Sequence, residues 1–187
     1  METTVTPTLD PRTLRNAFGY YTTGVVVVTT AGPEGQKAGV TVNSFTSVSL
    51  DPPLVLFCLL NSANAYRTWE QASHFTMNIL ASSQQHVSNV FARPSANPWE
   101  GIAHSVGDNG CPVLDGAATS LECERFQHFP GGDHLIIVGR VSAVRISASP
   151  REPLAFHRGK YGTYWGVDFG APPPDSSLSD MVMAGFG

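Results

Sequence analysis

The feature that most constrains the fold is the run Val25-Val26-Val27-Val28-Thr29-Thr30, in which every residue is β-branched. Branching at Cβ restricts a side chain in a helix and suits the pleated surface of a sheet, so the run predicts a β-strand. Its first four residues are all apolar rather than alternating with polar ones, which is typical of a strand covered on both faces. The chain must therefore place other elements on each side of this strand.

Five further segments have strand character: 37–50, 54–60, 75–80, 117–129 and 133–146. The last two flank Pro130-Gly131-Gly132, which is a hairpin signal. Strands joined by short turns predict an antiparallel sheet, and a closed or nearly closed barrel would remove its exposed edges.

Helical character is confined to three short segments, 10–18, 64–72 and 82–91, which we expect at the periphery. Asp10 can cap the first helix, and Pro11 suits its first turn. The run 92–110 is rich in Pro, Asn and Gly and predicts a long loop. We expect one domain over residues 1–165 and an extended, Pro-containing tail over 166–187.

Composition narrows the function classes. Charged residues make up only 14% of the 187-residue chain, which is low for a lone soluble domain and predicts that some surface is buried against another copy or a partner. The formal net charge is −4 and Lys and Arg form no run, so binding to nucleic acid or an anionic membrane has no electrostatic support. The apolar run 54–60 is too short to cross a bilayer.

The cysteines and the N-terminal residues indicate a cytoplasmic protein. Residues 1–20 lack a cationic start followed by an apolar stretch, so we expect no signal peptide. Cys58, Cys111 and Cys123 are an odd number and form no Cys-x-x-Cys pair. We expect free thiols in a reducing cytoplasm.

Common catalytic motifs are missing from the sequence. It contains no Gly-x-Gly-x-x-Gly fingerprint, no phosphate-binding P-loop and no Gly-x-Ser-x-Gly elbow. His-Glu-x-x-His and Cys-x-x-Cys are absent as well, so we expect no metal site. A cofactor that brings its own chemistry remains compatible with this sequence.

The most informative segment is GVTVNSFTSVSLDPP, residues 39–53, which places small hydroxyl and amide side chains inside a strand-like run. Such groups can hydrogen-bond the edge of a flat heteroaromatic ring. They can equally decorate a solvent-facing strand edge, because Ser and Thr are common on sheet surfaces. The residues alone leave both interpretations open.

This segment resembles the signature of flavin reductase-like proteins, which have an FMN-binding split barrel. Five further blocks match in order: TGVVVVTT (23–30), PPLVLFCL (52–59), HFTMNILASSQQHVSNVFA (74–92), GGDHLIIVGRV (131–141) and PLAFHRGKYG (153–162). The resemblance covers roughly residues 10–165 and is nearest to the reductase components of two-component flavin-dependent monooxygenases. It implies a mainly β, antiparallel, Greek-key-like split barrel with short peripheral helices.

The resemblance also implies site residues. Thr41, Val42, Asn43 and Ser44 would contact the isoalloxazine ring of FMN or FAD, with Ser47 and Val48 beside it. The positions that would lie near the ribityl, phosphate or adenine portions are these: Asn61, Ser62, Asn64, Ala65, Gln84, Phe91 and Ala92. Ala63-Asn64-Ala65 lacks the basic residue that the family often has there, which leaves two alternatives for the phosphate: backbone N–H groups at the start of the following helix, or Arg67 as a substitute charge.

The later blocks imply the nicotinamide side of the site. His134 would lie near the nicotinamide and position it, and Arg158 and Tyr161 would contact the dinucleotide. A lone His on a strand is more often structural, and Tyr161 has an equally plausible role in packing. Asp133, beside Gly131-Gly132, is interpreted as a turn former.

The expected function is hydride transfer from NADH to FMN or FAD. NADPH is less favoured as the donor because basic residues are few. A homodimer would supply reduced flavin to a partner monooxygenase. The alternative is a non-catalytic flavin-binding or electron-carrier protein on the same barrel. An oxidase of the pyridoxamine type is disfavoured because the 11 Lys and Arg residues are not clustered.

Overall fold

The computed structural model describes residues 10–164, except 65, 94, 96 and 150. Its larger sheet contains seven strands: β2 (Val26–Ala31), β3 (Lys37–Val42), β4 (Thr46–Leu50), β5 (Pro53–Leu60), β6 (His74–Ile79), β9 (Thr119–Gly131) and β10 (His134–Ile146). A second sheet contains three strands: β1 (Thr23–Gly24), β11 (Leu154–His157) and β12 (Lys160–Thr163). A third contains two: β7 (His104–Val106) and β8 (Pro112–Leu114). The helices are α1 (Pro11–Phe18), α2 (Tyr66–Gln71) and α3 (Gln85–Phe91), which follows the 3₁₀ turn η1 (Ser82–Gln84).

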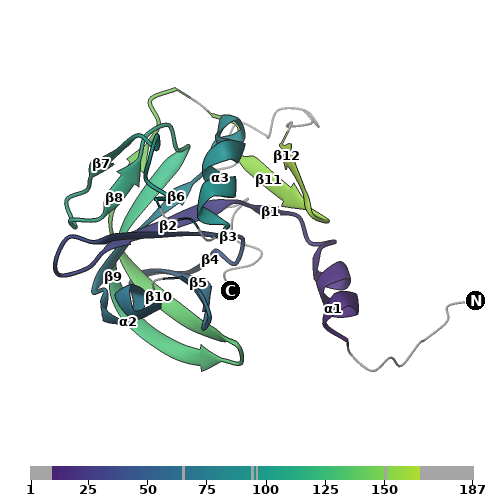
Figure 1. Cartoon of the computed structure of the whole chain (residues 1–187). Helices are drawn as coiled ribbons and strands as arrows, with labels where there is room; N and C mark the ends of the chain where they lie inside the picture. The colour runs from purple at the N-terminus through teal and green to yellow at the C-terminus, as the bar shows by residue number, and fades with distance from the viewer. Residues whose placement is uncertain (1–9, 65, 94, 96, 150, 165–187) are drawn as a thin grey trace, which may run out of the picture.

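The larger sheet must curl because of how its edges are joined. Its strand order is β3-β2-β6-β9-β10-β5-β4, so the edge strands β3 and β4 are consecutive in the chain. Laid flat, seven strands would separate these edges by about 29 Å. Only Asn43, Ser44 and Phe45 connect β3 to β4, and such a link spans about 14 Å at most. The sheet therefore rolls into a barrel (Figure 1).

All strand pairs in this sheet are antiparallel, from β2–β3 at one end to β4–β5 at the other. Because β3 and β4 are the two ends of the strand order, the barrel is split between them. The predicted mainly β, antiparallel split barrel with short peripheral helices is confirmed.

The strand β2 separates two apolar clusters. Val26 and Val28 pack inside the barrel with Phe57, Met77 and Ile137. Val25 and Val27 point the other way, into a second apolar cluster between the barrel and α3. Its other buried members are Leu80, Val87, Phe91, Ile102, Leu114 and Leu154, of which Val87 and Phe91 belong to α3. The β-branched run is therefore covered on both faces, as predicted.

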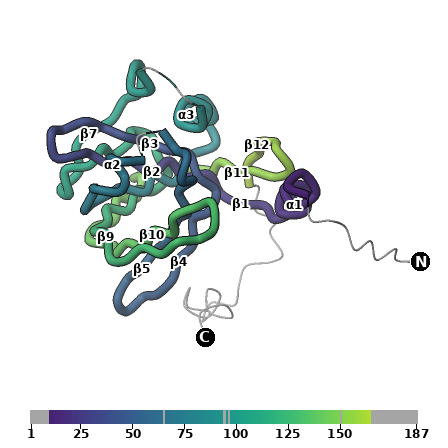
Figure 2. Tube along the Cα trace, turned by 60° about the horizontal axis from the view of Figure 1, so that its bottom comes forward, coloured from purple at the N-terminus to yellow at the C-terminus, as the bar shows by residue number. Residues whose placement is uncertain are grey.

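The helix α1 lies outside the barrel, beside β1, β11 and β12 (Figure 2). Asp10 caps it as expected, because its carboxylate accepts the backbone N–H groups of Arg12 and Thr13 at 2.9 and 3.0 Å. None of the residues of α1 is buried. Phe18, Tyr20 and Tyr21 expose 70%, 64% and 79% of their surface, so the described chain leaves most of this apolar face uncovered.

Three local expectations differ from the structure. The β-like stretch 37–50 is interrupted at 43–45, where the chain passes from one sheet edge to the other. The predicted loop 92–110 contains a strand, β7. Its residues His104, Ser105 and Val106 pair with β8, which lies directly after the predicted loop at 112–114. Helix α2 covers Tyr66–Gln71, which is shorter than expected. The predicted tail 166–187 lies outside the described residues.

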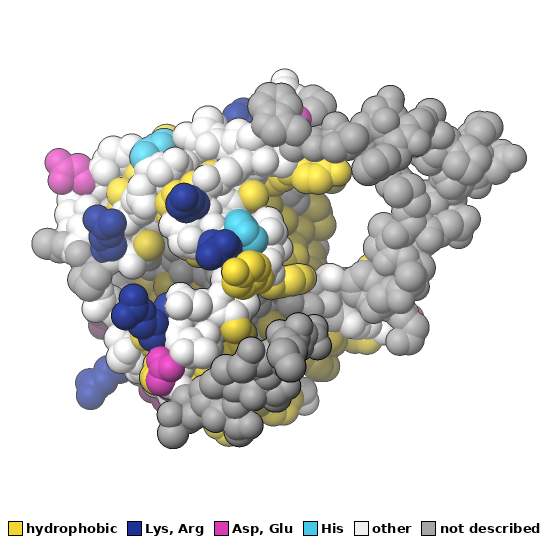
Figure 3. Space-filling model, turned by 90° about the vertical axis from the view of Figure 1, so that its right-hand side faces the viewer, with side chains coloured by type: hydrophobic (Ala, Val, Ile, Leu, Met, Phe, Trp, Pro, Cys, Tyr) yellow, Lys and Arg dark blue, Asp and Glu magenta, His cyan; other side chains and the backbone are white. Residues whose placement is uncertain are grey.

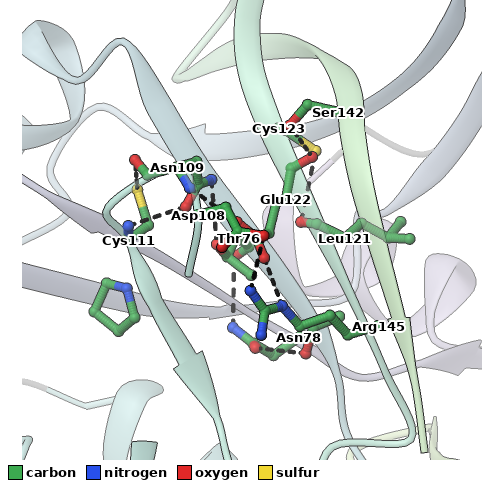
Figure 4. Close-up of polar contacts among 12 residues, drawn as sticks. Thr76, Asn78, Asp108, Asn109, Cys111, Leu121, Glu122, Cys123, Ser142 and Arg145 are labelled. Carbon is green, nitrogen blue, oxygen red and sulfur yellow. Dashed lines mark hydrogen bonds and ion pairs between the residues drawn. The ribbon is translucent and has the colours of Figure 1, made fainter. Parts of the chain in front are cut away.

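A buried carboxylate links β9 to the segment before β8. Glu122 is fully buried; its carboxylate accepts the N–H of Asn109 at 2.9 Å and the Arg145 Nε–H at 2.6 Å (Figure 4). Burial alone would raise the pKa of Glu122, but these hydrogen bonds outweigh burial and hold the pKa below its ordinary value of 4.5. A methyl group at Gly107 would lie 2.7 Å from Glu122 Oε2, so this approach requires glycine.

We predict that Glu122→Gln lowers the free energy of unfolding at pH 7 by about 1–3 kcal/mol, because a charged hydrogen-bond acceptor is lost in a buried place. Since the folded pKa is depressed, the stabilising effect is present above pH 4.5 and is lost as the pH falls through the folded value. Urea unfolding at pH 7 and at about pH 3.5 measures both effects.

The matched control is Glu124→Gln, which removes an exposed carboxylate from the same strand and should change stability little. An equal effect of the two substitutions would contradict the role assigned to Glu122.

Candidate functional site

A large open hollow lies beside the junction of β3 and β4. Its volume is about 1380 Å³. Four segments line it: α1 with the residues that follow it, the β3–β4 connection, the tip of the β9–β10 hairpin and the β11–β12 turn. On the face shown in Figure 3, hydrophobic side chains gather beside His, Lys and Arg side chains.

The β3–β4 connection contributes Asn43, Ser44 and Phe45 to the lining, and β4 contributes its first residue, Thr46. Ser44 Oγ accepts the backbone N–H of Cys58 at 2.9 Å, which fixes the connection to the middle of β5. The Asn43 side chain is exposed. The signature segment therefore presents one fixed hydroxyl and one exposed amide to the hollow.

The neighbouring signature residues lie elsewhere. Thr41 Oγ1 donates to the carbonyl of Ser88 at 2.7 Å, and Val42 belongs to the core inside the barrel. Ser47 and Val48 are exposed on β4, at a bulge, and do not line the hollow. Because side chains alternate along a strand, only part of the signature can face one ligand. Ring contacts by these four residues stay a prediction.

The turn after β5 holds the hairpin tip. The Asn61 N–H donates to the Asp133 carbonyl at 2.9 Å, and Asn61 Nδ2 donates to the Gly132 carbonyl at 3.3 Å. Ser62 and Asn64 are exposed. Ala65 lies outside the described residues. Asn61 therefore has a structural role, and contact of this turn with a flavin tail stays a prediction.

His134 begins β10 and lines the hollow together with Asp133. Its Nδ1 lies 2.7 Å from Asp133 Oδ1. The hydrogen bond from His134 lowers the pKa of Asp133 from its ordinary value of 3.8. The side chain of His134 is 39% exposed, so the ring is accessible to a ligand.

Arg158 and Gly159 form the two-residue turn between β11 and β12, and both have positive φ, 48° and 78°. This backbone conformation costs an arginine about 1 kcal/mol. The Arg158 N–H donates to the Gly19 carbonyl at 2.9 Å, and its guanidinium carbon lies 4.5 Å from the centroid of the Tyr20 ring. The turn is thereby tied to the end of α1, with the arginine along the hollow.

The other predicted residues do not line this hollow. The Tyr161 hydroxyl lies 2.9 Å from Ser88 Oγ and 3.2 Å from Asn89 Oδ1, and its ring packs on Phe156. Phe91 is buried so close to Gly39 that a methyl group there would lie 2.6 Å from its ring. Ala92 is exposed at the end of α3.

Gln84 also has structural partners. Its Oε1 accepts the Ala81 N–H at 3.1 Å, and its Nε2 donates to the Asp115 carbonyl at 2.9 Å. It borders a separate, smaller pocket of about 230 Å³ beside Arg151. Ligand contacts by these residues stay predictions.

Several lining residues were not predicted from the sequence, among them Arg15, Tyr20, Tyr21, Phe45 and Thr46. The available signal was the pair of aromatic residues after Gly19, which continues the apolar face of α1 beyond its end.

The hollow fits a flavin together with a nicotinamide. Pockets for single small ligands hold about 300–1,000 Å³, so about 1380 Å³ leaves room for two stacked rings. Aromatic residues from α1 onward and polar groups from the β3–β4 connection provide the mixed lining that a heteroaromatic cofactor needs. Two arginines, Arg15 and Arg158, suit phosphate groups.

Within the described ranges, no three or more His, Cys, Asp and Glu side chains are grouped so that they could hold a metal ion. None of the described helices is long and apolar enough to cross a membrane.

The chain matches the family model described as flavin reductase like domain over residues 18–164. It is 44% identical over 154 residues to a probable flavin reductase of Rhizobium meliloti; the match covers 82% of this chain but only 49% of that protein, so the chain spans about half the length of this relative.

Two solved structures are similar. Nitrilotriacetate monooxygenase component B from Mycobacterium thermoresistibile has a TM-score of 0.82 at 34% identity, covering 88% of this chain and 92% of that one. The NADH:FAD oxidoreductase SgcE6 of Streptomyces globisporus, in complex with NAD and FAD fragments, has a TM-score of 0.79 at 32% identity. The match covers 94% of this chain and 100% of that one. With the family model matching most of its length, the chain belongs to the flavin reductase like domain family.

Proposed function

We propose that this protein is an NADH-dependent flavin reductase that transfers a hydride from the nicotinamide to FMN or FAD. The observation that carries the proposal is the hollow at the β3–β4 junction, which is large enough for two rings and is lined by Asn43, Ser44, His134 and Arg158. The family match and the relatives named as flavin reductases support it.

Flavin, when bound, supplies the electrophilic N5 that accepts the hydride from C4 of the dihydronicotinamide. The reaction oxidises NADH to NAD⁺ and reduces the flavin by two electrons, with a proton taken from solvent. The protein's task is to hold the rings in contact, because direct hydride transfer needs alignment more than a protein base. Asn43 and Ser44 bind the polar edge of the flavin ring in this proposal, and His134 positions the nicotinamide.

The phosphate groups of the ligands are assigned to the arginine side of the hollow. The Arg158 guanidinium lies over the Tyr20 ring, and its backbone N–H is bonded to the Gly19 carbonyl. Little side-chain freedom is therefore lost when Arg158 binds an anion. NADH is favoured over NADPH because the extra phosphate would need further basic residues, and the chain has only 11 Lys and Arg. The SgcE6 structure, named as an NADH:FAD oxidoreductase, supports this choice of ligands.

The proposed partner is a flavin-dependent monooxygenase that receives the reduced flavin. The similar Mycobacterium thermoresistibile protein is named as component B of nitrilotriacetate monooxygenase, which supports a monooxygenase partner. In this arrangement the reductase does not need to recognise the organic substrate. The cytoplasm is the proposed compartment, and the three free cysteines fit a reducing environment.

A homodimer is the proposed assembly, and exposed apolar side chains support it. Leu60 and Phe129 are 42% and 47% exposed, and their cross-strand partners on β10 are His134 and Ile136. Paired residues of an antiparallel sheet point to the same side, so an apolar face continues from the barrel wall toward the hollow. A second copy would cover this face.

We predict that the purified protein oxidises NADH when FMN or FAD is added, with a higher kcat/KM for NADH than for NADPH. Steady-state kinetics with each flavin and each nicotinamide in turn measures this. Under nitrogen, NADH should bleach the flavin. Bound flavin that stays yellow would contradict the reductase and favour the electron-carrier alternative.

We predict that Asn43→Ala raises the Kd for FMN about fivefold to tenfold, because one hydrogen bond to the ring is lost. The melting temperature should stay near the wild-type value, since the side chain is exposed. Titration of FMN fluorescence measures the Kd. The matched control is Asn97→Ala, an exposed asparagine away from the hollow; equal FMN affinity in Asn43→Ala and wild type would contradict the assignment.

We predict by light scattering a mass of twice 20.0 kDa for the wild type at micromolar concentration. Phe129→Asp should shift the mass toward the monomer, because a charge would be buried at the interface. Val106→Asp is the control; it places the same charge at a 72% exposed position of another sheet. A monomeric wild type would refute the assembly.

A further inference from the structure

We propose that the smaller pocket, of about 230 Å³, binds a free amino acid with a branched aliphatic side chain, with Arg151 on its carboxylate and Asp115 on its ammonium group. The pocket lies between η1, the first turn of α3, the loop before β7, the end of β8 and the residue Arg151. None of its lining residues lines the hollow assigned to the flavin, so ligands can occupy the two independently.

Opposite charges line this pocket without pairing with each other. Asp115 directly precedes Gly116, and a methyl group at Gly116 would lie 3.9 Å from Arg151 Nη1, so the guanidinium reaches the chain beside Asp115. In the part of the chain that the structure describes, no ion pair within 4.0 Å joins Arg151 to Asp115. A ligand that carries both charges would neutralise both side chains at once.

The guanidinium of Arg151 is positioned for a carboxylate. Its Nε donates to Ser147 Oγ at 2.9 Å, which leaves the two Nη groups for a ligand. The chain directly after Arg151 is fixed to η1, because the Ser82 N–H donates to the Glu152 carbonyl at 2.8 Å. Two parallel N–H donors suit the two oxygens of a carboxylate. Arg151 is therefore assigned to the carboxylate end of the ligand.

Asp115 is held in the wall of the pocket through its backbone. Its N–H donates to the Ala103 carbonyl at 3.0 Å, and its carbonyl accepts a hydrogen bond from Gln84 Nε2 at 2.9 Å. These bonds use only backbone atoms of Asp115, and its residue is exposed. The carboxylate is therefore available to accept a hydrogen bond from an ammonium group, which only donates.

The remaining lining selects a ligand with an apolar part. Val87, Ile102 and Leu114 are buried members of the apolar cluster beneath this pocket. An apolar cavity of about 150 Å³ admits a molecule the size of benzene. A pocket of about 230 Å³ therefore has room for a branched aliphatic side chain together with two small charged groups. An inorganic anion or a simple amine would leave the apolar lining uncovered.

Calorimetric titration of the full-length protein tests this ligand class with L-leucine and two analogues. The first, 4-methylpentanoate, lacks the ammonium group, and the second, 3-methylbutylamine, lacks the carboxylate. Leucine should bind with a Kd about tenfold or more below that of either analogue, because each analogue leaves one charge of the pocket without a partner. No binding of leucine at about 10 mM, or equal affinity for an analogue, would overturn the proposal.

Two substitutions assign the two ends of the ligand. Arg151→Gln should abolish the preference for leucine over 3-methylbutylamine, and Asp115→Asn should abolish the preference for leucine over 4-methylpentanoate. Both residues are exposed, so the melting temperatures without ligand should stay near that of the wild type. The matched control is Arg93→Gln, an exposed arginine that lines neither cavity. Unchanged preferences in Asp115→Asn would reduce the pocket to an anion site and refute the zwitterion.

Methyl NMR locates the bound amino acid without any turnover of NADH. On titration with leucine, the methyl signals of Ile102 should shift, whereas those of Ile137, inside the barrel, should stay in place. Leucine should also raise the melting temperature of the wild type but not that of Arg151→Gln. Binding with no shift at Ile102 would place the ligand elsewhere and refute the assigned pocket.

Discussion

The short connection between β3 and β4 is the constraint on which the rest of the structure depends. It joins strands that lie at opposite ends of a seven-stranded order, so the sheet has to roll up. The strand order nevertheless ends at β3 and β4, which leaves a seam in the barrel wall. Edge strands keep unpaired backbone N–H and C=O groups, and a seam that stays open offers these groups to a ligand. The fold therefore creates its candidate site at the place where it fails to close.

The other segments around the hollow are held in place by contacts between the loops. Ser44 fixes the connection to β5 through the N–H of Cys58. Asn61, directly after β5, fixes the tip of the β9–β10 hairpin. Arg158 attaches the β11–β12 turn to the residues after α1. The side chains that reach the hollow therefore come from loops, but each loop is fixed by a neighbouring element.

Much of the fold could be predicted from local signals. Val25–Thr30 is β-branched throughout, Gly131-Gly132 marks a hairpin, and Asp10 is a helix cap, and all three predictions hold. The interruption of the stretch 37–50 was not predictable, because it follows from the strand order, a long-range property. The same limit applies to β7, whose pairing with β8 overrides a composition typical of loops.

The site was harder to predict than the fold because side-chain direction depends on register. Asn43 and Ser44 reach the hollow, whereas Val42, one residue earlier, points into the core. Arg15 and Tyr20 lie too far along the chain from the signature for any local pattern to connect them to it. Asp133 reads as a turn residue in the sequence, and only the structure places its carboxylate beside the His134 ring.

A crystal structure of the protein with bound FMN is the decisive measurement of where the flavin ring lies. We expect the isoalloxazine ring at the β3–β4 junction, with ring atoms within about 4 Å of Asn43 and Ser44. A flavin bound instead in the pocket beside Gln84 and Arg151, or on a face away from the seam, would refute binding at the β3–β4 junction.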